Sequence, residues 1–74
     1  MRLPQISGFK LIKIFCKVGF VVVRRKGSHV RLEKMVDGKI IKLTVPMHDK
    51  LKKGTLSRII KDSKLSENEF EKLF

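Results

Sequence analysis

Residues 20–45 read FVVVRRKGSHVRLEKMVDGKIIKLTV, and this stretch decides the fold. Its β-branched and apolar residues come in short runs separated by turn-forming residues, which predicts three β-strands. The strands are expected at residues 20–26, 29–35 and 39–45. Gly27-Ser28 forms the first predicted turn and Val36-Asp37-Gly38 the second. Connections this short require an antiparallel meander.

Alternation of side chains along the strands assigns the two faces of this sheet. The apolar positions share one face and can pack beneath helices: Val30, Leu32, Ile41, Leu43 and Val45. The polar positions share the opposite face: His29, Arg31, Glu33, Lys42 and Thr44. Residues 20–23 are all apolar, so alternation leaves the faces of the first strand undecided. We therefore expect His29 on a polar and largely uncovered surface.

Helices are predicted before and after the strands. Ser7 can cap a first helix that stops at Gly19, with apolar residues at helical spacing. Its lysines form a stripe on the opposite side: Lys10, Lys13 and Lys17. Pro46 ends the third strand, residues 47–54 form a polar loop, and Thr55 can cap a second helix. The apolar residues of that helix have i, i+3, i+4 spacing: Leu56, Ile59 and Ile60.

The last residues predict one more short helix. Ser66 and Glu69 have the spacing of a capping box, and Leu65 and Phe70 have that of its hydrophobic staple. The apolar residues expected in this helix are Phe70, Leu73 and Phe74. The predicted order is therefore α-β-β-β-α-α, an α+β fold with helices packed on one face of a three-stranded antiparallel sheet.

Size and composition limit the kind of protein this can be. At 74 residues and 8.6 kDa, we expect one small domain over residues 1–74. The single cysteine excludes an internal disulfide and favours a reducing compartment. The longest apolar run, residues 20–23, is far shorter than the roughly 20 residues of a membrane span. Lysines interrupt any signal-peptide core. We expect a soluble, cytoplasmic protein with no membrane partner.

Positive charge dominates the chain and is unevenly distributed. There are 18 Lys and Arg against 7 Asp and Glu, which gives a net charge of +11 and a pI near 10.3. Residues 1–61 hold 16 basic and 3 acidic side chains, whereas residues 62–74 hold 2 basic and 4 acidic ones. A basic surface on so small a protein attracts polyanions, so nucleic acid is the first partner to consider.

His29 is the main candidate for chemistry, because histidine readily accepts and donates protons at neutral pH. It follows the Gly27-Ser28 turn, where glycine allows close approach of another backbone. The cations around it in sequence are Arg24, Arg25, Lys26 and Arg31. RNA carries its own nucleophile, the 2′-hydroxyl, so its cleavage needs alignment, a proton acceptor and charge stabilisation at phosphorus. A histidine among arginines and lysines can supply these without a metal.

Other candidate sites are weaker. Cys16, His29 and His48 lack the close spacing of a metal site, and no phosphate-binding loop or dinucleotide motif is present, so we expect no metal and no small-molecule cofactor. Lys52 and Lys53 precede a helix N-terminus that attracts phosphate, although they also fit a solvated loop. His48 either assists at the site or caps the loop.

Five motifs in order resemble a known family. They are Leu3-Pro4-Gln5-Ile6-Ser7-Gly8, Val18-Gly19-Phe20, Arg25-Lys26-Gly27-Ser28-His29, Val45-Pro46-Met47-His48, and Lys52-Lys53-Gly54-Thr55-Leu56 followed by Ile59-Ile60. Residues 3–66 thus resemble a HicA-type mRNA interferase toxin. The resemblance implies a fold like the double-stranded-RNA-binding domain and the toxin role in a type II toxin–antitoxin pair. It also implies metal-independent cleavage of mRNA by a single histidine, His29, and a HicB-type antitoxin partner that blocks the active face.

The residues expected to contact RNA around His29 are Arg24, Arg25, Lys26, Gly27, Ser28 and Arg31, with Lys52 and Lys53 as positioning contacts. Two other functions compete with this hypothesis. The chain could be a non-catalytic double-stranded-RNA-binding module, because paired lysines before a helix also suit phosphates across a groove. It could also be a pure interaction protein whose charge serves an acidic partner.

Overall fold

The computed structural model describes residues 5–73 and contains three strands and three helices in the predicted order. The elements are α1 (Gly8–Lys17), β1 (Val21–Lys26), β2 (His29–Val36), β3 (Lys39–Pro46), α2 (Lys53–Asp62) and α3 (Glu67–Glu71). Leu3 and Pro4 of the first motif, and Phe74 of the last predicted helix, lie outside the described residues. Within the described part, no helix has the length and apolar character needed to cross a membrane.

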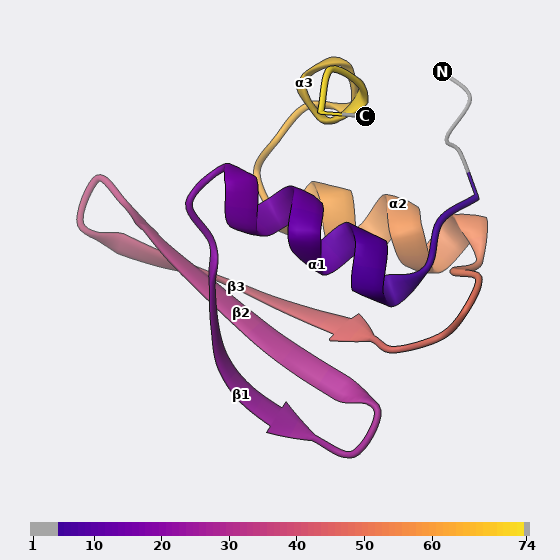
Figure 1. Cartoon of the computed structure of the whole chain (residues 1–74). Helices are drawn as coiled ribbons and strands as arrows, with labels where there is room; N and C mark the ends of the chain where they lie inside the picture. The colour runs from indigo at the N-terminus through magenta and orange to yellow at the C-terminus, as the bar shows by residue number, and fades with distance from the viewer. Residues whose placement is uncertain (1–4, 74) are drawn as a thin grey trace.

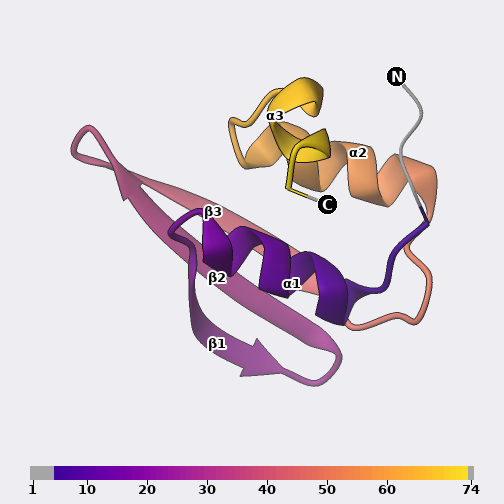
Figure 2. The same cartoon turned by 45° about the horizontal axis from the view of Figure 1, so that its top comes forward.

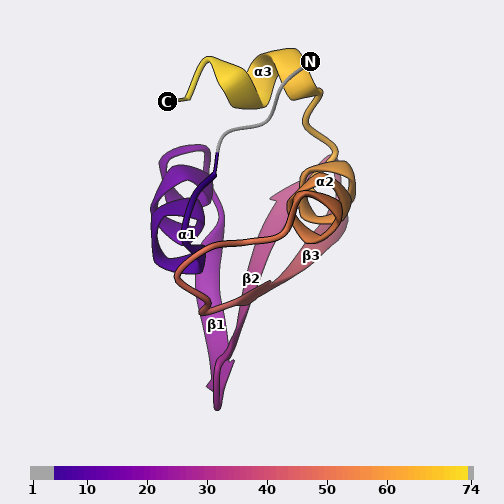
Figure 3. The same cartoon turned by 90° about the vertical axis from the view of Figure 1, so that its right-hand side faces the viewer.

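The elements form layers, as Figure 1 and the end-on view of Figure 3 show. The sheet has the order β1-β2-β3 with both neighbouring pairs antiparallel. Helices α1 and α2 lie side by side over one face of it, and α3 lies across them on the side away from the sheet (Figure 3). The predicted α+β order is confirmed, and no helix of residues 5–73 lies on the opposite face of the sheet.

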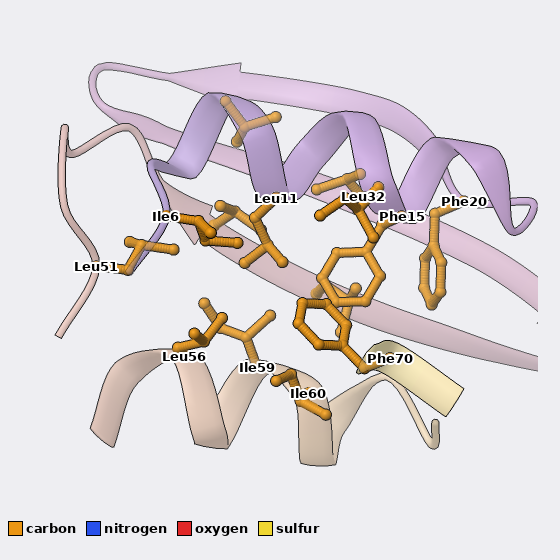
Figure 4. Packing of buried hydrophobic residues seen from close by; sticks show 14 residues of the cluster. Ile6, Leu11, Phe15, Phe20, Leu32, Leu51, Leu56, Ile59, Ile60 and Phe70 are labelled. Atoms are coloured by element: carbon orange, nitrogen blue, oxygen red, sulfur yellow. The ribbon is translucent and has the colours of Figure 1, made fainter. Parts of the chain in front are cut away.

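The core lies between the inner face of the sheet and the helices (Figure 4). The inner face contributes the predicted apolar positions, of which Val30, Leu32, Leu43 and Val45 are buried and Ile41 is partly buried. The helices contribute Leu11, Ile14, Phe15, Leu56, Ile59 and Ile60, all buried. Phe70 of α3 is also part of this cluster, with its ring centroid 5.9 Å from that of Phe15. The capping box of Ser66 and Glu69 is confirmed.

The predicted second turn is one residue too long. Val36 still pairs with Lys39, so β2 extends to Val36 and only Asp37 and Gly38 form the turn.

The predicted Thr55 cap is wrong. Helix α2 begins at Lys53, because the Leu56 N–H donates to the Lys52 carbonyl at 2.9 Å, and Lys52 occupies the N-cap without a side-chain hydrogen bond. Buried Leu51, whose N–H donates to the Ile6 carbonyl, holds the chain so that Lys52 takes the N-cap position directly after it. Tertiary contacts here outweigh the capping preference of threonine.

Gly8 is required by a close approach of backbone. Its N–H donates to the His48 carbonyl at 2.9 Å, and a Cβ at this position would lie far inside contact distance of the Pro46 carbonyl oxygen. We expect Gly8→Ala to destabilise the protein by about 1–3 kcal/mol through this overlap, although alanine is the better helix former. The matched control is Gly54→Ala in α2, where a Cβ meets nothing within 4 Å. That change should stabilise by about 0.4–1 kcal/mol. Urea denaturation of both variants measures the difference, and equal shifts would contradict the proposed overlap.

Candidate functional site

The uncovered face of the sheet carries a shallow pocket next to the β1–β2 turn. It has a volume of about 220 Å³ and is lined by Arg24, Lys26, His29, Arg31 and Thr44. Each of these residues is exposed. The pocket thus joins one imidazole, three cations and one hydroxyl on an open surface.

Strand register brings these residues together. Lys26 lies opposite His29, and Arg24 lies opposite Arg31. On the other side of β2, Thr44 of β3 lies opposite Arg31. Residues directly opposite each other in an antiparallel pair share a face of the sheet. The polar face predicted from alternation is therefore confirmed, with Arg24 and Lys26 added to it from β1.

A β-bulge turns these two cations towards His29. Val22 lies opposite Leu32 and Arg24 lies opposite Arg31, so the register shifts and Val23 is the extra residue. In a regular strand Arg24 would share the face of Val22, because residues two apart point the same way. The bulge moves Arg24 to the outer face, as bulges near functional sites often re-aim a side chain. Because residues 20–23 are all apolar, alternation in the sequence does not reveal this shift.

The same register separates Arg25 from the pocket. Arg25 lies opposite Val30, a buried inner-face residue, and it is absent from the pocket lining. Its side chain is exposed, so it belongs to the margin of the inner face. Arg25 is close to His29 in the sequence, which is why it was expected at the site. The strand pairing instead places it away from the cations that line the pocket.

A tight turn and a hydrogen bond to a neighbouring loop fix the backbone next to His29. Gly27 has φ +59°, at the first central position of the two-residue turn, a conformation that favours glycine. The Ser28 carbonyl accepts a hydrogen bond from the Met47 N–H at 2.6 Å, which ties the turn to the loop after β3. Among residues 5–73, no group hydrogen-bonds to the imidazole of His29. Its backbone is fixed while its ring is free to meet a ligand.

A second cationic pocket lies at the start of α2. It has a volume of about 380 Å³ and is lined by Lys52, Gly54, Thr55 and Arg58. Lys52 is at the N-cap and Lys53 is the first helical residue, so both predicted lysines lie at the helix N-terminus, but only Lys52 lines the pocket. In Figure 1 this end of α2 lies at the same end of the molecule as the β1–β2 turn.

His48 lies in the loop between β3 and α2 and is exposed. Its carbonyl, rather than its ring, makes the contact that the structure shows, by accepting from the Gly8 N–H. No described residue, Asp49 included, hydrogen-bonds to its side chain. His48 is absent from both cationic pockets.

Four residues that line the two pockets are not among the sequence candidates: Thr44, Gly54, Thr55 and Arg58. The sequence predicts Thr44 on the polar face of the sheet but does not single it out as a site residue. Its position opposite Arg31 is the signal that identifies it as part of the pocket. Arg58 lies one helical turn after Gly54, and that i, i+4 spacing is the signal that it shares a face with the helix start. Among residues 5–73, no three His, Cys, Asp or Glu side chains gather where they could hold a metal ion.

Comparison with known families finds a match over most of the chain. The model of a family described as "HicA toxin of bacterial toxin-antitoxin" matches residues 8–65 of the 74-residue chain. The matched range contains the sheet, α1, α2 and both cationic pockets, whereas α3 lies after it. No curated protein and no solved structure matches the chain.

Proposed function

Because the chain belongs to the HicA toxin family of bacterial toxin–antitoxin systems, we propose that it acts as an endoribonuclease that cleaves mRNA in the cytoplasm and uses His29 as its proton-transfer group. The observation that supports this proposal is the exposed His29 ring in a pocket with Arg24, Lys26 and Arg31. A HicB-type antitoxin is the protein partner that keeps the enzyme inactive.

The chemistry needs only this pocket, the RNA and water. His29 accepts the proton of a ribose 2′-hydroxyl, and the 2′-oxygen bonds to the adjacent phosphorus while the bond from phosphorus to the 5′-oxygen breaks. The products are a 2′,3′-cyclic phosphate and a 5′-hydroxyl, and the departing oxygen takes a proton from water. Arg24, Arg31 and Lys26 bind the phosphate and offset the charge that develops on its oxygens. Lys52, Lys53 and Arg58 bind the RNA backbone at the start of α2.

Purified protein should therefore cut single-stranded RNA in the presence of EDTA. The products should end in 2′,3′-cyclic phosphates, and RNA with 2′-O-methyl groups throughout should remain intact, because it lacks the nucleophile. Gel electrophoresis and mass spectrometry of the fragments measure both results. A requirement for divalent metal, or cutting of the methylated RNA, would contradict the proposed mechanism.

The two neighbouring arginines of β1 provide a matched test of the pocket. Arg24→Ala should lower the cleavage rate by about 10–100-fold, because Arg24 lies beside His29 and would contact the phosphate in the transition state. Arg25→Ala removes the same charge from the margin of the inner face and should change the rate by less than about threefold. Single-turnover kinetics on one RNA oligonucleotide measures both. Equal losses of rate would mean that cleavage depends on the total positive charge of β1 and not on the position of Arg24 in the pocket.

The pocket of Lys52 and Arg58 at the start of α2 favours a second candidate function, a non-catalytic double-stranded-RNA-binding module. Such a module would bind RNA duplexes with an affinity that falls steeply with salt, and would leave them uncut. The EDTA experiment separates the two functions, since only the endoribonuclease yields cyclic phosphate ends.

A further inference from the structure

Strand β1 is an exposed edge of the sheet. It pairs only with β2, and within the described residues no backbone or side-chain group hydrogen-bonds to its other side. All six of its residues are exposed. In Figure 2, β1 lies below α1 and apart from α2 and α3. Its outer side is therefore open to another extended chain.

The opposite edge of the sheet differs from β1. Strand β3 has three buried residues at its C-terminal end, Val45 and Pro46 among them, and both α1 and α2 contact it. By contrast, Val21, Val22 and Val23 of β1 are 60%, 44% and 50% exposed. An edge that combines consecutive exposed valines with unpaired backbone groups is a template for strand pairing.

The composition of β1 indicates what kind of strand would pair with it. The three valines are followed by Arg24, Arg25 and Lys26. A complementary strand would place apolar side chains beside the valines and acidic ones beside the cations. A chain with a net charge of +11 attracts such a partner and repels a second copy of itself.

We propose that β1 accepts an extended, acidic strand of the protein antitoxin along its free edge. The added strand would lie about 4.8 Å from β1, and its residues opposite Arg24 and Lys26 would share the face of His29. Carboxylates at those positions would pair with the cations that otherwise hold RNA phosphate. Strand addition thereby blocks the pocket. This inference rests on the proposed function only for the existence of the antitoxin and for the use of the pocket by RNA.

Hydrogen exchange tests the pairing directly. The chain is prepared alone and in complex with the antitoxin encoded beside its own gene, and amide exchange is followed by NMR. In the complex, the β1 amides that face away from β2 should exchange at least about tenfold more slowly, because each gains a backbone hydrogen bond. A complex in which these amides exchange as in the free chain would overturn the proposal, as would failure of the two proteins to bind. Protection of β1 in the free chain, together with a dimeric mass, would assign the edge to a second copy instead.

A pair of matched variants tests the contribution of charge. Val23→Glu adds an acidic side chain to the bulge of β1, and Ile40→Glu adds one to β3 at nearly the same exposure, 50% against 52%. Val23→Glu should weaken antitoxin binding by about tenfold or more, since it repels an acidic strand, while Ile40→Glu should leave it nearly unchanged. Equal effects in calorimetry would overturn the proposal. Both measurements concern binding alone and do not depend on RNA cleavage. If the complex forms as expected but the chain cuts no RNA, the proposed function is refuted and the strand addition is not.

Discussion

His29→Ala is expected to lower RNA cleavage by about 10²–10⁴-fold, the usual contribution of a side chain that transfers a proton in the transition state. The fold should not change, because His29 is exposed and no described group hydrogen-bonds to its ring. Substitutions at such surface positions usually change stability by no more than about 0.5 kcal/mol. RNA binding at low salt should persist, since Arg24, Lys26 and Arg31 still line the pocket. Cleavage kinetics, thermal unfolding and filter binding together measure these three quantities.

His48→Ala is the matched control, because His48 is the other histidine of the chain and is also exposed. It is absent from both cationic pockets, and its carbonyl contact with Gly8 survives the substitution. The cleavage rate should therefore fall by less than about tenfold, well below the contribution expected of an acid or base. A loss at His48 as large as that at His29 would mean that two histidines share the reaction. Undiminished cleavage by His29→Ala would remove His29 from the mechanism.

Local patterns in the sequence predicted the elements of this fold well. The meander follows from short apolar runs between turn residues, and alternation identified the buried positions of β2 and β3. The Ser66 capping box and the burial of Phe70 also follow from spacing alone. Each of these signals depends on residues that are near each other in the chain.

Apart from the one-residue error in the second turn, where Val36 pairs with Lys39, the sequence patterns failed where the structure depends on contacts between residues distant in the chain. The start of α2 depends on Leu51 and its contact with Ile6, which no local pattern contains. The bulge at Val23 depends on the register against β2, so four consecutive apolar residues gave no sign of it. This one irregularity decides which cations reach the pocket. It explains why Arg24 lines the pocket while Arg25 does not.

Phe70→Ala is expected to destabilise the protein by about 3–5 kcal/mol, the usual cost of removing a buried phenylalanine. Phe70 is fully buried, and its ring packs at a tilt against Phe15, which in turn packs against Phe20 at 5.3 Å between ring centroids. A domain of this size has about 4–11 kcal/mol of stability in total, at 0.05–0.15 kcal/mol per residue. The substitution would therefore remove a large part of it. Urea denaturation at constant temperature measures the change.

Phe9→Ala is the matched control, since it makes the same chemical change at a phenylalanine that is 57% exposed. The Lys13 ammonium lies 4.7 Å from the centroid of this ring, a contact worth little at an exposed site, so the expected cost is below about 1 kcal/mol. If Phe70→Ala cost as little stability as Phe9→Ala, α3 would add nothing to the core.

The Phe70 prediction also separates stability from activity. Helix α3 lies on the side of α1 and α2 that faces away from the sheet (Figure 3), whereas the His29 pocket is lined by residues of the uncovered face of the sheet. Residues 8–65, which match the family, contain the pocket, and α3 follows them. Phe70→Ala should therefore cleave RNA at a normal rate per folded molecule at low temperature, and lose activity on warming in parallel with unfolding. A lower rate in fully folded protein would instead mean that α3 reaches the site through the helix layer.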